Sequence, residues 1–264
     1  MIMGTLFDPL FLTPFVNGLL LSVVLALLGP YSRMRGEWLA SLGVAQAAGA
    51  GLLLGASLGG AATIGALAAA AVAAVAKTVL GRRSGNDSYA VMLLVGWSTA
   101  LLLAANIARG EDLSHALLEG QLYFTDTSQL WSIAALVTIV VVTMTVLSRR
   151  LLLGCLLPDR IVGDSRPAAR YDLAFDILVA ISLALAATVV GVMAAFALVF
   201  IPAWVAFRVA GNWRSTVTWS LVLGTAAYAG SFALAIIFDQ PYGPVLVAAL
   251  LVVGSSRALV RGRA

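Results

Sequence analysis

Apolar stretches of about 20 residues follow one another along nearly the whole chain, separated by short polar or glycine-rich breaks. This is the length that a helix needs to cross the hydrocarbon core of a bilayer. Charged residues make up 11% of the chain and the mean hydropathy is +1.01, whereas soluble proteins carry about 25% charged residues. We therefore predict an all-α, polytopic membrane helix bundle that forms a single domain over residues 1–264.

The breaks divide the chain into candidate membrane spans. These cover residues 10–30, 38–58, 61–80, 89–108, 129–148, 173–192, 194–210, 216–237 and 243–259. The second and third stretches nearly touch, and Gly191 and Pro202 interrupt the run from 173 to 210, so the prediction is eight to nine spans. No basic residue precedes the first stretch and no small-residue cleavage site follows it, so we expect a span there rather than a signal peptide.

Lysine and arginine residues indicate the orientation of the spans, because membrane proteins carry an excess of them on cytoplasmic loops. With an external N-terminus and nine spans, all of the 16 Lys and Arg residues except Arg109 fall at the cytoplasmic side. We therefore predict an N-out, C-in protein of the cell inner (plasma) membrane, surrounded by membrane lipid. The basic residues do not form a stripe with interleaved aromatics, so nucleic acid is not expected as a partner.

Motifs of soluble enzymes are missing from the sequence. It has no Walker A loop, no CxxC pair, no HExxH and no GxSxG. One cysteine, Cys155, and one histidine, His115, exclude a disulfide within the chain and a closed structural zinc site of the usual Cys and His ligands. We expect a transport protein that is not an enzyme, does not hydrolyse ATP itself and binds no cofactor of its own.

Polar side chains inside the predicted spans are candidates for a transport path, because they are costly in lipid. Glu37 lies at the cytoplasmic mouth of the second span and Asp176 about one turn into the sixth. The alternative for Asp176 is a residue near the membrane surface that is solvated or paired with an arginine. Gln46 and Asn106 are uncharged and expected to be buried; Gln46 either lines a pore or forms a hydrogen bond between helices.

The longest external polar segment runs from Arg109 to Ser128. Its residues Glu111, His115 and Glu119 are four apart, so a helix would place them on one face. Such a face could bind a divalent metal ion at the outer mouth of a path. The alternative is an amphipathic helix that lies on the membrane surface.

The longest cytoplasmic segment covers residues 149–172 and mixes apolar and charged residues. Pro158 is suited to the first turn of a short helix. A short helix of this character could dock a soluble partner, and the alternative is a basic loop that only anchors the topology.

Four short motifs occur in a particular order along the chain. They are Gly120-Gln121-Leu122; Pro158-Asp159 with Asp164 and Arg170; Gly191 with Pro202-Ala203 and Arg208; and Asp239-Gln240-Pro241-Tyr242-Gly243-Pro244. In this order and spacing the chain resembles the permease (transmembrane) subunit of metal-ion-type ABC importers, the zinc, manganese and iron class. The resemblance covers most of the sequence and is most specific in the C-terminal third.

The sequence departs from that family where the family carries an Asp and a His four residues apart at the start of the second span. An alignment without gaps places Leu42 and Gln46 there, and a shifted alignment places Glu37 and Ser41 there. Leu42 has no ligating atom and the Gln46 amide is a weak ligand, so no confident metal ligand is assigned.

The resemblance implies a permease domain that imports a divalent metal ion (zinc, manganese or iron) or a metal chelate. It implies as partners a cytoplasmic ABC ATPase that uses the ATP, an extracytoplasmic substrate-binding protein, and a second permease copy or a paralogue. The 149–172 segment would be the coupling segment, with the ATPase contacts at Pro158, Asp159, Ile161 and Asp164. The candidate substrate path comprises Leu42, Gln46, Glu37, Ser41 and Asn106. The alternatives are an ABC permease for a non-metal substrate and an ion-coupled secondary transporter, although the sequence shows neither the acidic relay nor the inverted repeats of the latter.

Overall fold

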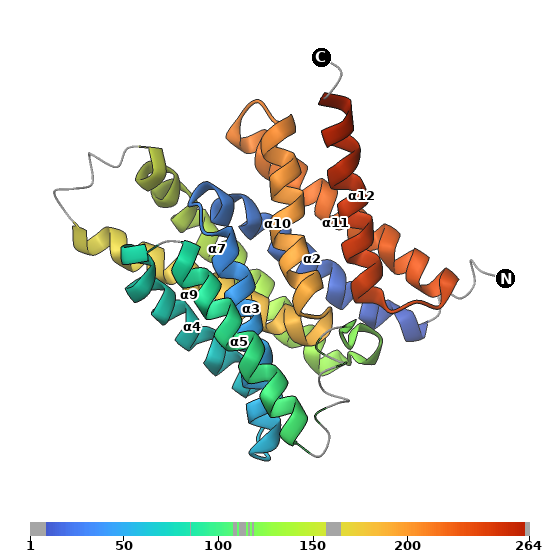
Figure 1. Ribbon diagram of the computed structural model, residues 1–264. Coiled ribbons are helices and arrows are strands. Elements are labelled where there is room, and N and C mark those ends of the chain that lie inside the picture. Colours follow the sequence, from blue (N-terminus) through green and yellow to red (C-terminus); the bar gives the residue numbers. More distant parts are fainter. Residues whose placement is uncertain are drawn as a thin grey trace.

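The structure, a computed structural model, consists of long helices (Figure 1). It describes residues 9–84, 86–107, 110, 115, 117, 119–156 and 165–261. Within these residues the long helices are α2 (Pro9–Met34), α3 (Trp38–Ser57), α4 (Ala62–Ser84), α5 (Asn86–Asn106), α7 (Thr127–Leu156), α9 (Ser165–Val189), α10 (Val192–Val209), α11 (Trp213–Phe238) and α12 (Tyr242–Arg261), with a short 3₁₀ helix, η1 (Leu122–Phe124).

Each of the predicted spans corresponds to one of these helices, so the all-α bundle is confirmed. Seven helices are long and apolar enough to cross a membrane, and the other two, α4 and α12, have shorter apolar stretches, Ala62–Thr78 and Tyr242–Ser255. Since α4 has 23 residues and α12 has 20, their full lengths are about 34 and 30 Å, close to the thickness of the hydrocarbon core.

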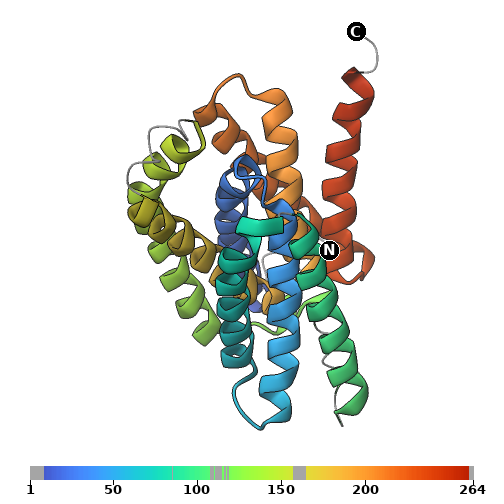
Figure 2. The same cartoon turned by 60° about the vertical axis from the view of Figure 1, so that its left-hand side comes forward.

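Successive helices run in alternating directions. Figure 2 shows the α10–α11 turn and the end of α12 at one end of the molecule, and the α3–α4 turn at the opposite end. The distribution of Lys and Arg predicts that the first end is cytoplasmic and the second external. The structure therefore has the alternation that the predicted topology requires.

Helix α10 lies at the centre of the bundle and packs against α2, α3, α9, α11 and α12. It is separated from α9 at Gly191, whose φ of 91° lies in a region that side chains disfavour. Pro202 does not break α10, which continues to Val209. The sequence left open whether the run from 173 to 210 is interrupted at Gly191 or at Pro202. The structure places the boundary between the two helices at Gly191.

Helices α3 and α4 form a close antiparallel pair through small residues. A Cβ atom added at Gly51 would collide with the backbone oxygen of Gly65, and one added at Gly65 would collide with that of Gly51. Small residues allow membrane helices to approach closely without a hydrophobic driving force. This pair holds α3 in place, and α3 carries several of the candidate site residues.

Candidate transport path and coupling region

One side of α3 faces the aromatic side of α10 at the cytoplasmic end of the bundle. The rings of Trp38 on α3 and Phe200 on α10 lie 5.0 Å apart. Leu42 and Gln46 follow Trp38 at intervals of four residues, so they lie on the same side of α3. Both are half-buried, whereas Ser41 on the neighbouring side is buried.

Helix α5 closes in on α3 near Gln46. A Cβ atom added at Gly96 of α5 would lie 3.1 Å from the Gln46 Cβ and 2.8 Å from the Ala47 backbone nitrogen. Gln46 is therefore beside the α3–α5 contact, on the side of α3 that continues from Trp38. The carboxamide is the polar group that this side offers between residues 38 and 46.

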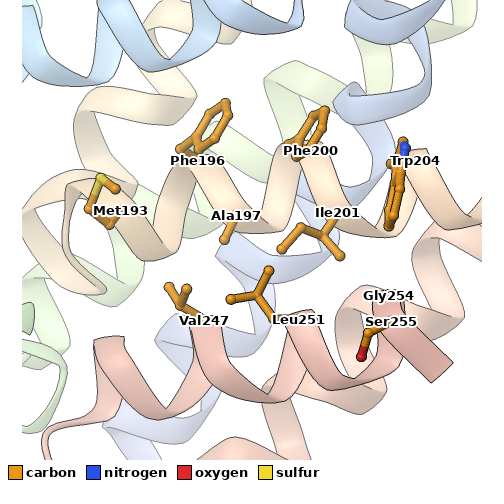
Figure 3. Close-up of a pocket in the computed structure, with 10 residues that line it drawn as sticks. All are labelled: Met193, Phe196, Ala197, Phe200, Ile201, Trp204, Val247, Leu251, Gly254 and Ser255. Atoms are coloured by element: carbon orange, nitrogen blue, oxygen red, sulfur yellow. The ribbon is translucent and has the colours of Figure 1, made fainter. Parts of the chain in front are cut away.

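A cavity of about 570 Å³ lies between α10 and α12. Figure 3 shows Phe196, Phe200 and Trp204 in a row along α10, with Val247 and Leu251 on the facing α12. Phe196 and Phe200 stack with their ring centroids 5.5 Å apart. The lining is almost wholly apolar, with the Ser255 hydroxyl as its polar side chain, and it contains no ionisable group.

The described part of the chain contains no group of three or more His, Cys, Asp or Glu residues placed to hold a metal ion. At the external segment His115 Nδ1 and Glu119 Oε1 lie 3.9 Å apart and both side chains are exposed. Glu111, the third residue of the predicted metal face, lies outside the described residues. The structure therefore shows a pair at this place.

Asn106 differs from the expectation. We predicted that it is buried among apolar residues, but its side chain is exposed at the end of α5 and donates a hydrogen bond of 2.8 Å to the Leu102 carbonyl. Val95 and Leu102, on the same side of α5, are exposed as well, so no other described helix covers this side. The carboxamide finds its partner within its own last turn. It does not lie next to Leu42 or Gln46 along the α3 side.

Four charged residues, of which Glu37 is half-buried and the others are more deeply buried, form a cluster at the cytoplasmic end of α3, α4 and α9, which we call the ion cluster: Arg35, Glu37, Lys77 and Asp176. Lys77 Nζ lies 2.6 Å from Asp176 Oδ1 and 2.9 Å from Glu37 Oε2. Arg35 Nε lies 2.7 Å from Glu37 Oε2, and Arg35 Nη2 lies 3.3 Å from Asp176 Oδ1. Two cations thus balance two carboxylates within the cluster.

Of the alternatives for Asp176, the structure shows the pairing with an arginine. Its side chain is 3% exposed and contacts both Arg35 and Lys77, so it is not solvated. Asp172, one turn earlier on α9 and 48% exposed, adds a contact of 3.2 Å to Arg35 Nη1. Burial alone would lower the pKa of the Arg35 guanidinium, but Asp176, Glu37 and Asp172 raise it above its ordinary value.

Lys77 was missed as a site residue by the sequence analysis. The signal was present, because Lys77 directly follows the alanine-rich stretch from Ala66 to Ala76 and is the one charge in that part of α4. An ionisable side chain at such a place needs a partner. The partners, however, lie 40 and 99 residues away in sequence.

The predicted ATPase contacts, Pro158, Asp159, Ile161 and Asp164, lie outside the described residues. The described flanks of the 149–172 segment contact each other. The Arg150 guanidinium lies 5.4 Å from the centre of the Tyr171 ring, which joins the end of α7 to the beginning of α9. The segment therefore leads directly into α9 and its ion pairs.

Three of the four sequence motifs meet at the external end. Gly120, with a φ of 83°, is packed so closely on Val190 that a Cβ atom would lie 2.5 Å from the Val190 carbonyl carbon. A Cβ atom at Gly243, within the outer turn before α12, would lie 2.7 Å from the Glu119 oxygen and 3.2 Å from the Val190 oxygen. Gly120 and Gly243 therefore both pack against Val190, the residue before Gly191 at the α9–α10 break.

Comparisons with known proteins identify the family and the fold of the chain. Residues 8–257 match the ABC 3 transport family, and the chain belongs to that family. It is a multi-pass transmembrane permease subunit of an ABC transporter in the inner membrane. Among solved structures it is similar to PsaBC from Streptococcus pneumoniae in complex with Fab, with a TM-score of 0.83 and 16% identity over 95% of this chain and 92% of that one. No curated protein matches the sequence.

Proposed function

We propose that this permease imports a divalent metal ion of the zinc, manganese and iron class, or a chelate of one, along the α3 side that carries Trp38, Leu42 and Gln46. The observation that carries the proposal is the meeting of this side with the aromatic row of α10 at Trp38 and Phe200, 5.0 Å apart. The transport role in this proposal is supported by the fold and by membership of the family. The residues of the α3 side support the second part of the proposal, that the path has no strong metal ligands.

A path of this kind holds a cation weakly. High-affinity zinc sites use imidazole, thiolate and carboxylate groups, and the α3 side offers a carboxamide at Gln46 and an alkyl group at Leu42. Selectivity then belongs to an extracytoplasmic binding protein, or the cargo arrives already chelated. A weak site also allows release, which transport requires.

A second permease copy or a paralogue would complete the path. Figure 2 shows α5 and α12 along the same side of the molecule. Both expose large apolar side chains, among them Val95 at 59% and Val252 at 66%. A second copy on this side would cover that surface and enclose the α10–α12 cavity, which a single copy leaves open to its surroundings.

A cytoplasmic ABC ATPase would supply the energy by docking on the 149–172 segment. Closure of the ATPase pair on ATP would move that segment, and the movement would switch access to the path between the two sides of the membrane. No ATP site is assigned to this chain, and no resident cofactor is part of the proposal.

The test is uptake by the complete complex of permease, ATPase and binding protein in liposomes. We expect ATP-dependent accumulation of zinc, manganese or iron, supplied as the free ion or as a chelate. A non-metal cargo is the second candidate, favoured by the apolar lining of the α10–α12 cavity. Steady ATP hydrolysis without accumulation of any of these metals in either form would favour that second candidate.

A further inference from the structure

We infer that the ion cluster of Arg35, Glu37, Lys77 and Asp176 transmits movement of the cytoplasmic coupling segment to α3, and that Lys77 and Asp176 are positioning residues for coupled transport. The inference rests on the proposed function, in which an ATPase docks on residues 149–172. The inference concerns the step after docking, in which movement passes from the coupling segment into the helix bundle.

The cluster is connected to the coupling segment at one end. Asp172 is the last residue of that segment, and its carboxylate contacts Arg35 at 3.2 Å. Asp176 follows one turn later on the same helix. Because α9 is continuous from Ser165 to Val189, a displacement of its first turns carries both carboxylates with it.

The cluster is connected to the transport path at the other end. Glu37 directly precedes Trp38, the first residue of α3, and binds both Arg35 and Lys77. Trp38 begins the side of α3 that continues through Leu42 and Gln46. A shift of Glu37 therefore changes the position of that side relative to Phe200 of α10.

The burial and charge of the cluster make this connection stiff. The side chains of Arg35, Lys77 and Asp176 are 9%, 8% and 3% exposed. A buried charge that loses its partner is strongly unfavourable, so the carboxylates cannot move away from the cations without an alternative partner. Thr78 offers Asp176 a further contact at 3.4 Å, also from α4. The ion pairs thus make α9, α4 and the start of α3 move as one body.

A packing role alone would not need charges at these positions. Replacement of a buried ion pair by apolar residues of similar volume often leaves stability unchanged. A variant can therefore keep the bundle folded and still remove the ion pair that joins α4 to α9. The double substitution Lys77→Met with Asp176→Leu removes one positive and one negative charge, and Arg35 and Glu37 still balance each other.

The experiment compares this double variant with the parent as complete complexes with ATPase and binding protein in liposomes. Zinc and manganese, each delivered by the binding protein, serve as probes, and uptake and ATP hydrolysis are measured in the same vesicles. We expect co-purification with the ATPase and hydrolysis within about twofold of the parent, while metal moved per ATP falls about tenfold or more. Tyr31→Phe is the matched control, because it removes the 2.7 Å hydrogen bond to Ser148 between α2 and α7 and leaves the ion cluster intact.

An unchanged ratio of uptake to hydrolysis in the double variant would overturn the inference. If that variant does not reach the membrane, Lys77→Gln with Asp176→Asn replaces it, because it also removes one charge of each sign and keeps a polar side chain at both positions, and the same two results decide. A parent complex that hydrolyses ATP without moving metal contradicts the proposed function itself. Metal uptake by the parent complex therefore distinguishes a failure of the proposed function from a failure of the inference about the ion cluster.

Discussion

Lys77 of α4 and Asp176 of α9 form a buried ion pair with Nζ and Oδ1 2.6 Å apart. The pair joins two helices that are separated by 99 residues in sequence, at the level where the cytoplasmic segment enters the bundle. Glu37 completes the contact from the start of α3. The ion pairs therefore lie where α4, α9 and the start of α3 pack together.

The first prediction concerns the stability of this pair. Asp176→Asn leaves Lys77 and Arg35 with one buried carboxylate fewer, so unfolding should become easier by about 3–5 kcal/mol. Asp172→Asn is the matched control, because this half-exposed residue should change stability by less than about 1 kcal/mol. Thermal unfolding in detergent measures both. Equal effects of the two substitutions would contradict the importance of burial.

The pH dependence of stability should show the contribution of Glu37. Burial alone would raise the pKa of this carboxyl, but Lys77 and Arg35 outweigh it and hold the pKa below its ordinary value. A lowered pKa in the folded state stabilises above the unfolded pKa of about 4.3, and this stabilisation is lost as the pH falls through the folded pKa. The unfolding temperature of the parent should therefore fall in acid below about pH 4.3 more steeply than that of Glu37→Gln. Identical pH profiles would show that Glu37 is not held by these cations.

The α3–α4 contact should not tolerate a side chain at Gly65. In Gly65→Ala the new methyl group would meet the Gly51 backbone oxygen and the Gly55 Cα, 2.9 Å away. We expect a loss of about 1–3 kcal/mol from forced overpacking. Gly230→Ala on α11 has open space around the new atom and should be neutral or slightly stabilising. Detergent unfolding curves of the two variants check the difference, and similar curves would argue against the close helix contact.

The orientation of the bundle can be measured with single-cysteine variants after replacement of Cys155, which is exposed. Asp239→Cys, in the turn between α11 and α12, should react with an impermeant thiol reagent added outside the cell. A cysteine at Asn212, in the turn between α10 and α11, should react only in inverted vesicles. Labelling of position 239 from the cytoplasmic side alone would contradict the predicted topology.

The helices could be predicted from the sequence because their signals are local. An apolar run of sufficient length, ended by Gly191 or by the Asp239–Pro244 turn, defines a span without knowledge of its neighbours. The ion cluster could not be predicted in the same way. The partners of Lys77 depend on how α4 packs against α9 and on the α2–α3 turn, and residue type alone does not determine that packing. Asn106 shows the same limit, because its exposure depends on which side of α5 the other helices cover.

The metal affinity of the path can be raised by design. Leu42→Asp with Gln46→His places a carboxylate and an imidazole one turn apart on the α3 side, which suits a divalent cation. The variant should retain more metal than the parent and transport less of it, because a tight site slows release. The same pair built at Leu54 and Leu58, exposed positions in the last turn of α3 and directly after it, controls for binding by any Asp–His pair.

The central claim, a metal permease whose own path holds metal weakly, is tested most directly by the metal content of the parent chain. The measurement is zinc, manganese and iron per molecule after purification in detergent without the binding protein. The account predicts substoichiometric metal in the parent and retained metal in the Leu42→Asp, Gln46→His variant. Stoichiometric zinc or manganese in the parent would contradict it, and loss of that metal on His115→Ala would place the site at the external segment instead.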